Sequence, residues 1–369
     1  MLPFARLTFW FLCSRLFLLV VAWLGICFVP PGWWDFSREP LNWFNKWDAG
    51  WYLNVAKNGY SYDPNAQSTV AFFPLYPKLV HYFGLLVPDL RISGYLVSNA
   101  LLFGSCLLLW KVVERDYGDR ELADRSVLFL LFCPVTVFFS SIYSESTFLF
   151  LLLAVAWYAG SRRWLMAGAV GFFAALARSP GLLVSGLVAV EYGSRFYQGG
   201  KIHFRENFRW EEAVKVLVAL AMPALGLAFY MAFLQYKFGD WLAFAHTQIH
   251  WGRHVVAFWH LPWGAATYPP FYRIWFYESV VVSFIFTALA VAFRLRPSHL
   301  ALVFAFMLLY CSMDLLASFP RFLSVVFPFY IVAAEICLRH PRWERWFLGL
   351  SAALAALSTV LFVNGYWYT

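Results

Sequence analysis

Residues 47–60 read WDAGWYLNVAKNGY and carry one carboxylate, Asp48, among several aromatic side chains. Trp47, Trp51 and Val55 recur at i, i+4 and i+8, which predicts a short amphipathic helix with Asp48 beside its apolar face. A Trp-rich helix of only about three turns belongs at a membrane surface rather than across a membrane. We therefore expect this segment to hold Asp48 at the water–lipid boundary.

The next segment predicts a second surface helix. Gly59 suits the end of the first helix. Residues 71–77 then read AFFPLYP, and Pro74 or Pro77 suits the first turn of a new helix. The apolar run continues over residues 72–87, but prolines and two basic residues interrupt it. We interpret this run as a surface or re-entrant helix rather than a membrane span.

Composition identifies the surrounding protein as a polytopic membrane protein. The chain has 369 residues, of which 62% are hydrophobic and 13% are charged, whereas soluble domains average about 25% charged residues. The net charge of +8 comes from cations scattered through short loops, which argues against a nucleic-acid partner. The six cysteines show no CxxC spacing and fit small core residues. We predict one all-α membrane domain over residues 1–369.

Eleven apolar runs predict membrane spans. They cover approximately residues 6–29, 91–110, 126–141, 146–160, 164–177, 181–194, 213–236, 275–293, 298–316, 322–338 and 346–363. Several are shorter than a full crossing, which fits helices that end beneath a cavity. Two large external loops, 30–90 and 237–274, connect them.

The distribution of cations orients these spans. With a cytoplasmic N-terminus, eighteen of the 28 Lys and Arg residues fall in inside segments, although the outside loops are longer. This is the positive-inside pattern. Treating residues 72–87 as a span would reverse it. The same orientation brings the Asp48 segment, the turn at residues 140–146 and several other polar clusters to the external face.

Four residues at that face are candidates for chemistry, and each has a structural alternative. Asp48 suits a general base, but it could also cap a helix or pair with Lys46. Glu145 lies in a hydroxyl-rich turn, which could simply be solvated. Arg178 and Arg321 each lie beside a proline at the external end of a span, where they could bind a phosphate or extend to lipid headgroups.

Further substrate contacts are assigned from the same external segments. Tyr143 can hydrogen-bond a sugar or phosphate, and we add Trp47, Tyr52 and Lys78 of the first loop. His246, His250 and His254 repeat every four residues, with Arg253 among them. A metal site is one interpretation. We prefer an external amphipathic helix whose His246 and His250 contact substrate or headgroups, and we predict no metal and no cofactor.

The motifs together resemble those of the PIG-V family, the second mannosyltransferases of GPI-anchor synthesis and their prokaryotic relatives. The first-loop pattern over residues 47–60 and 71–77 resembles the family's first external loop. Residues 143–146 (YSES) resemble the next motif. Residues 177–181 (ARSPG) resemble another, with Pro180 where Asn is expected, and Arg321 with Pro328 resembles the last.

This resemblance implies a GT-C glycosyltransferase that acts on the extracytoplasmic face of the cell membrane. Its donor is a sugar, expected to be mannose, on a polyprenyl phosphate, and Asp48 matches the essential acidic residue. The acceptor is a lipid or glycan. The chain is short for a eukaryotic member, so we expect a prokaryotic one. The main rival interpretation is a lipid or sugar transporter, which usually shows internal repeats and binding residues near the bilayer midplane.

Overall fold

The computed structural model describes residues 3–32, 37–198, 201–203, 208–257, 270–313 and 318–366. Within these ranges the regular structure is helical apart from one short antiparallel hairpin, in which β1 (Tyr197–Gln198) pairs with β2 (Lys201–Ile202). The predicted all-α class is therefore confirmed.

The α-helices in the bundle are α1 (Phe4–Phe28), α4 (Leu90–Tyr117), α5 (Arg120–Leu131), α6 (Val137–Ser140), α7 (Glu145–Gly160), α8 (Trp164–Ala177), α9 (Val184–Gly193), α11 (Trp210–Phe238), α14 (Pro270–Ala292), α15 (Pro297–Cys311), α16 (Phe319–Leu323), α17 (Pro328–Arg339) and α18 (Pro341–Val363). The external segments add α2 (Asp48–Asn58), α3 (Leu75–Phe83) and α12 (Ala243–His246). The 3-10 turns are η1 (Pro40–Asn42), η2 (Thr69–Ala71), η3 (Ser179–Leu183), η4 (Ser194–Phe196) and η5 (Thr247–Trp251).

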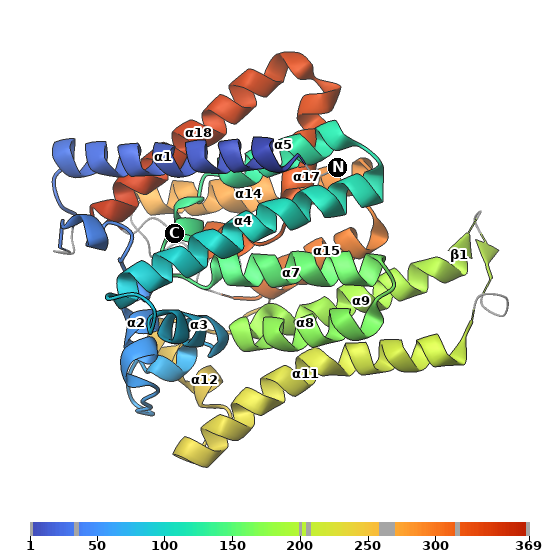
Figure 1. Ribbon diagram of the computed structural model, residues 1–369, viewed down its shortest axis with the longest axis horizontal. Helices are drawn as coiled ribbons and strands as arrows, with labels where there is room; N and C mark the ends of the chain where they lie inside the picture. Colours follow the sequence, from blue (N-terminus) through green and yellow to red (C-terminus); the bar gives the residue numbers. More distant parts are fainter. Residues whose placement is uncertain are drawn as a thin grey trace.

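The helices form a bundle with two distinct ends. α1 lies against α18, and α4 crosses the bundle to pack on α7 (Figure 1). The helices α2, α3 and α12 gather at one end, at the lower left of the view, while β1 lies at the other end. The two predicted external loops therefore meet at a single end, which we call the outer end. The other end is called the inner end.

Close packing of α8 on α11 depends on glycines. A Cβ added at Gly168 would lie 2.6 Å from the Cα of Ala219, and one added at Gly226 would lie 2.3 Å from the carbonyl oxygen of Phe172. Small residues of this kind let helix backbones approach closely inside a membrane, where van der Waals packing rather than the hydrophobic effect drives association.

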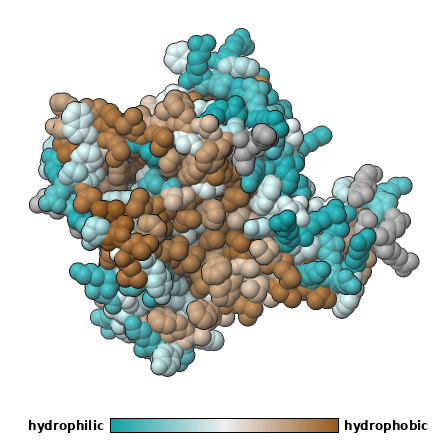
Figure 2. Space-filling view, viewed as in Figure 1, coloured by the Kyte–Doolittle hydropathy of each residue, from teal (hydrophilic) through white to brown (hydrophobic). Residues whose placement is uncertain are grey.

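The surface matches a multi-pass membrane protein, but the predicted number of spans is not confirmed. Five described helices are long and apolar enough to cross a bilayer: α1, α4, α11, residues 273–292 of α14, and α18. Figure 2 shows hydrophobic side chains over the middle of one face and hydrophilic ones toward its ends. Helices α7, α8 and α15 are apolar but shorter than the usual crossing length.

Some predicted spans are interrupted helices. The run at 126–141 divides into α5 and α6, and the run at 181–194 begins with η3 before α9. Arg15, in the interior of α1, lies at the first break: its Nη2 donates to the carbonyl oxygen of Leu131 at 3.1 Å, and its Nη1 donates to the Ser140 hydroxyl at 2.6 Å. The Leu131 carbonyl, which has no helical partner at the interruption, thus accepts from Arg15 and also from the Thr136 hydroxyl at 3.0 Å.

Helices form at both places predicted in the first external loop, but their amphipathic character is not confirmed, and Trp47 precedes α2 instead of lying on its apolar face. α2 ends at Gly59, which has φ +79° and whose N–H donates to the Val55 carbonyl, as the sequence predicted. α3 follows Pro74, and Pro77 lies in its first turn. Tyr52, Val55 and the small residues beside them form the buried face of α2. Their location at the membrane surface stays a prediction.

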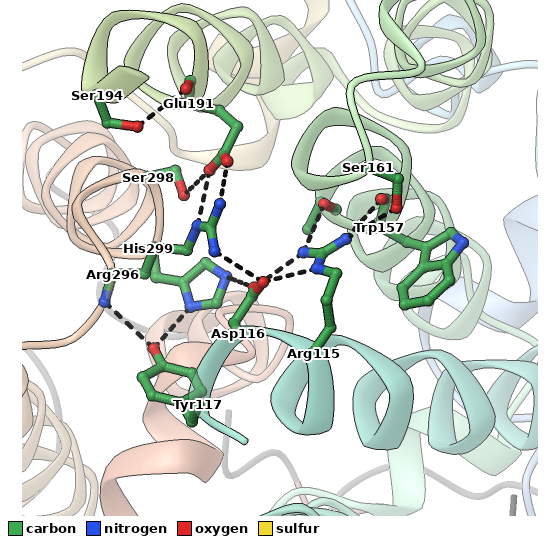
Figure 3. A network of polar contacts seen from close by, with 11 residues as sticks. Arg115, Asp116, Tyr117, Trp157, Ser161, Glu191, Ser194, Arg296, Ser298 and His299 are labelled. Atoms are coloured by element: carbon green, nitrogen blue, oxygen red, sulfur yellow. Dashed lines mark hydrogen bonds and ion pairs between the residues drawn. The ribbon is translucent and has the colours of Figure 1, made fainter. Parts of the chain in front are cut away.

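A buried polar network ties the helices together at the inner end (Figure 3). Asp116, at the end of α4, has a fully buried side chain that pairs with Arg115 at 2.6 Å, Arg296 at 2.9 Å and His299 at 3.3 Å. Arg296 also pairs with Glu191 of α9. One carboxylate therefore joins α4 to the start of α15, and a second one joins α15 to α9.

We expect Asp116→Asn to destabilise the fold by about 3 kcal/mol, because it removes the one buried negative charge that Arg115, Arg296 and His299 share. Thermal unfolding of the purified protein in detergent measures this. Glu335→Gln is the matched control: Glu335 pairs with a half-exposed Arg339 at 2.8 Å, and such pairs contribute at most about 1 kcal/mol. Equal melting temperatures for Asp116→Asn and Glu335→Gln would contradict a stabilising role for the network.

Candidate active site at the outer end

Asp48 is fixed in place by its backbone. It is the first residue of α2, directly after Trp47, whose φ of +54° is unusual for a residue other than glycine. Tyr143, before α7, holds both flanking peptides: its hydroxyl accepts from the Asp48 N–H at 3.1 Å and donates to the Lys46 carbonyl at 3.0 Å. Backbone strain of this kind persists where the surrounding structure enforces it, often at functional sites.

Lys46 supports the same turn from the other side. Its side chain is buried, and the Nζ donates to the Ser37 carbonyl at 2.8 Å. Burial, and then the charge of Arg38, lowers the pKa of Lys46 to about 8. The alternative pairing of Asp48 with Lys46 is not the one observed, because Asp48 pairs with Arg321 instead.

Two carboxylates and two arginines form the centre of the site. Arg321 Nη1 donates to Asp48 Oδ2 at 2.8 Å, and Arg178 Nη1 donates to Glu145 Oε1 at 2.7 Å. The Nε of Arg321 approaches Glu145 Oε1 to 3.2 Å without hydrogen-bond alignment. Glu145 is 1% exposed and Arg321 4%, whereas Asp48 is 15% exposed. Asp48 is thus the more accessible of the two carboxylates.

Residues of the hydroxyl-rich turn lie behind this centre. Ser144 shares a 2.7 Å hydrogen bond with the Tyr52 hydroxyl and accepts a longer one, 3.5 Å, from Arg178. Glu145 begins α7, and Ser146 donates to the Phe139 carbonyl at 2.7 Å. This turn, which the sequence left open as ordinary solvated structure, is fully buried.

A cavity of about 340 Å³ opens beside Asp48. Its polar lining includes Asp48, Arg178, Gln248, Arg253, Tyr310 and Arg321, and its aromatic lining includes Tyr52, Phe72, Trp251 and Phe322. The lining comes from the first external loop, the start of η3, the η5 segment, α15 and α16. Asp48, Arg178, Arg321 and Tyr52 were predicted together from sequence, and the cavity brings them together. Glu145 and Tyr143 contact them from behind.

The two histidines predicted to bind substrate hold the external loops together. His246 donates through Nδ1 to Asp240 at 2.8 Å, and the Tyr62 hydroxyl donates to the same carboxylate oxygen at 2.8 Å. His250 Nε2 donates to the Pro64 carbonyl at 2.8 Å. Neither histidine lines the cavity, although His254 does.

The expected helical repeat of histidines is absent because the helix stops. α12 ends at His246, and the 3-10 turn η5 follows. Lys78, also predicted to bind substrate, is exposed on α3 away from the cavity lining. Among the residues that the structure describes, no group of three or more His, Cys, Asp or Glu is placed to hold a metal ion.

Arg253, Trp251 and Tyr310 line the cavity but were not predicted from the sequence as site residues. Arg253 stood out in the sequence only as a neighbour of the histidines. The available signal was the pairing of Trp251 and Arg253 around Gly252 in a polar external loop, since an aromatic ring beside a cation is typical of binding surfaces. Tyr310 gave no signal, because a tyrosine in an apolar run resembles any other core residue.

The sequence is similar to that of known mannosyltransferases. The family described as Mannosyltransferase (PIG-V) matches residues 35–273. GPI mannosyltransferase 2 of Drosophila melanogaster is 30% identical over 213 residues, which cover 49% of this chain and 46% of the fly protein. GPI alpha-1,6-mannosyltransferase 2 of Mus musculus is 30% identical over 207 residues, which cover 53% of this chain and 40% of the mouse protein. The matches thus span about half or less of these relatives.

A solved structure shows a similar fold. ArnT from Cupriavidus metallidurans bound to undecaprenyl phosphate aligns with a TM-score of 0.54 and 15% identity, covering 98% of this chain and 77% of that one. The likeness supports the GT-C-like helical bundle that the motifs predicted. The family match over residues 35–273 covers more than half of the chain and identifies its family. The chain belongs to the mannosyltransferase (PIG-V) family.

Proposed function

We propose that this protein is an inverting glycosyltransferase that moves mannose from a polyprenyl-phosphate carrier to a lipid or glycan acceptor. The observation that carries the proposal is the placement of Asp48 on a cavity that also contains arginine side chains. Family membership supports mannose as the sugar. The undecaprenyl phosphate bound to ArnT supports the class of carrier.

The cavity suits this chemistry in size and lining. Small-molecule sites usually occupy about 300–1,000 Å³, and this one measures about 340 Å³. Phe72 and Trp251 line the cavity with their ring centroids 5.6 Å apart, and Trp51, which is outside the lining, packs against Trp251 at 5.2 Å. Apolar ring faces of this kind accommodate the carbon face of a sugar, while the arginines accommodate the phosphate.

The reaction needs one base and cationic stabilisation. The acceptor hydroxyl attacks the anomeric carbon from the side opposite the phosphate, and Asp48 takes the hydroxyl proton. The bond between the anomeric carbon and the phosphate oxygen breaks, and its electron pair leaves with the phosphate. The configuration inverts, so a β-linked donor gives an α-linked product. The arginines stabilise the departing negative charge.

The roles of the remaining residues follow from their contacts. Arg321 holds Asp48 in the orientation needed for proton transfer, and Glu145 anchors Arg321 and Arg178. Phosphate departs without an acid, so a second catalytic carboxylate is unnecessary, and the proposal includes no metal or other cofactor. The outer end, where the cavity lies, corresponds to the extracytoplasmic face of the cell membrane in the cation-based orientation.

A transporter or flippase is the alternative. Its binding residues would be expected near the middle of the bundle. The charged groups described here lie instead where α7 begins and α8 ends, beside the external loops. This position favours chemistry on a lipid-linked substrate at the membrane edge.

We expect Asp48→Asn to lower kcat for mannose transfer by about 100- to 10,000-fold while donor binding persists, because an amide cannot accept the acceptor's proton. Purified protein, radiolabelled polyprenyl-phosphate mannose and a membrane lipid extract provide the assay. Asp63→Asn, at an exposed carboxylate of the same external loop, is the matched control and should retain wild-type transfer.

Equal transfer by wild type and Asp48→Asn would remove Asp48 from the chemistry. Failure of the wild type to transfer sugar to any extract, together with lipid movement in reconstituted vesicles, would favour the transporter.

We expect Arg321→Lys to lower kcat by about 10- to 100-fold with little change in melting temperature. A lysine keeps the charge but presents a single point of contact, so it cannot engage Asp48 and Glu145 as the planar guanidinium does. Steady-state kinetics and thermal unfolding measured side by side test this. Wild-type kcat in the lysine variant would mean that Asp48 needs no orienting partner.

A further inference from the structure

The arginines of the cavity differ in how their charges are compensated. Arg178 and Arg321 each pair with a carboxylate, Glu145 and Asp48 respectively. Arg253 forms no ion pair with any residue that the structure describes. Its Nη1 donates to the amide oxygen of Gln248 at 2.9 Å, and its buried Nε has no hydrogen-bond partner in the described chain.

All three guanidinium groups gather at one aromatic ring. The distances to the ring centroid of Phe322 are 5.1 Å for Arg178, 5.4 Å for Arg253 and 4.9 Å for Arg321. Phe322 itself stacks on Tyr310 at 5.2 Å. Three cations thus surround the site against two carboxylates, and the positive charge in excess belongs to Arg253.

The electrostatic environment of Arg253 agrees with this count. Burial is the main cause that lowers the pKa of its guanidinium; the charge of Asp48 opposes this effect, and the charges of Arg321 and Arg178 add to it. A partly buried cation without a counterion is costly unless a ligand supplies the missing negative charge.

Other donors in the cavity also lack partners. The indole Nε1 of Trp251 and the hydroxyl of Tyr310 are buried without a hydrogen-bond partner in the described chain, and both residues line the cavity beside Arg253. Unpaired buried donors cost free energy, which a bound acceptor restores. An oxyanion with several acceptor oxygens matches a group of N–H and O–H donors better than a neutral sugar does.

We propose that Arg253, supported by Tyr310, is the principal receptor for the phosphate of the lipid carrier, whereas Arg178 and Arg321 mainly position the two carboxylates. This assignment rests on the proposed function. During transfer, the electron pair of the broken carbon–oxygen bond goes to the phosphate that Arg253 contacts. The second external loop therefore contributes a catalytic residue, and the phosphate site is assembled from segments far apart in sequence.

The test is binding of the sugar-free carrier, which needs no turnover. Undecaprenyl phosphate is titrated into the full-length protein in phosphatidylcholine nanodiscs, and binding is followed by tryptophan fluorescence or calorimetry. Arg253→Gln should weaken binding by about 10- to 100-fold, in the range of a lost charge-assisted hydrogen bond. Arg253→Lys should recover part of it, because the charge is kept. Lys57→Gln, at an exposed cation of α2, is the matched control and should bind normally.

A matched ligand separates the charge from the lipid tail. Undecaprenol lacks the phosphate, so its affinity should be the same for wild type and Arg253→Gln, and this retained binding also shows that the variant is folded. Undecaprenyl phosphate binding that is unchanged in Arg253→Gln overturns the assignment, as does an equal loss of affinity for the alcohol.

Sugar transfer measured in parallel distinguishes the two proposals. If Arg253→Gln binds the carrier normally but Asp48→Asn abolishes transfer, the phosphate assignment fails and the transferase proposal stands. If carrier binding depends on Arg253 but the wild type transfers no sugar, the transferase proposal fails and the phosphate site stands. In an active enzyme, Arg253→Gln should raise the donor KM by at least as large a factor as it lowers kcat.

Discussion

The contact of Arg321 with Asp48 is the interaction on which the outer end of this protein depends. The two residues are separated by most of the chain, and the 2.8 Å hydrogen bond between them joins the first external loop to α16. The same guanidinium lies 3.2 Å from Glu145, so it also reaches the start of α7. Each of the two carboxylates helps to compensate the buried charge of Arg321. Asp48, the more accessible of the two carboxylates, is thereby held at the cavity by noncovalent contacts.

The backbone around Asp48 is also held in a defined conformation. Trp47 adopts a positive φ, and the Tyr143 hydroxyl bonds to the peptides on both sides of it. Neither feature contributes chemistry by itself. Together with Arg321 they fix both the main chain and the side chain of Asp48, which is the precision that the proposed proton transfer would require.

Local patterns in the sequence predicted the elements well where helices begin and end at strong signals. The predicted run 164–177 coincides with α8, because charged residues precede it and Arg178 with a proline follow it. Grouping the polar clusters at one face also brought Asp48, Arg178 and Arg321 together correctly. The histidine spacing was misleading because it assumed a continuous helix, whereas α12 ends at His246.

Other features had no local signal. Arg15 hydrogen-bonds to the end of α5, where the chain is interrupted before α6, although it lies more than a hundred residues away in the sequence. In the sequence, the positive-inside pattern counts Arg15 simply as a cation on the cytoplasmic side. The unpaired charge of Arg253 likewise appears only when its neighbours in space are known. Pairing of side chains across the bundle is a property of the tertiary structure, and helical periodicity carries no information about it.

The polar network at the inner end has a mechanical consequence. Arg115, beside Asp116, also donates to the Trp157 carbonyl near the end of α7 at 2.6 Å, so α4, α7, α9 and α15 are pinned where they lie farthest from the cavity. At their opposite ends, α7 begins with Glu145, which lies behind the cavity, and α15 carries Tyr310, which lines it. Because these helices are fixed at the inner end, any rearrangement around the cavity is confined to their outer ends.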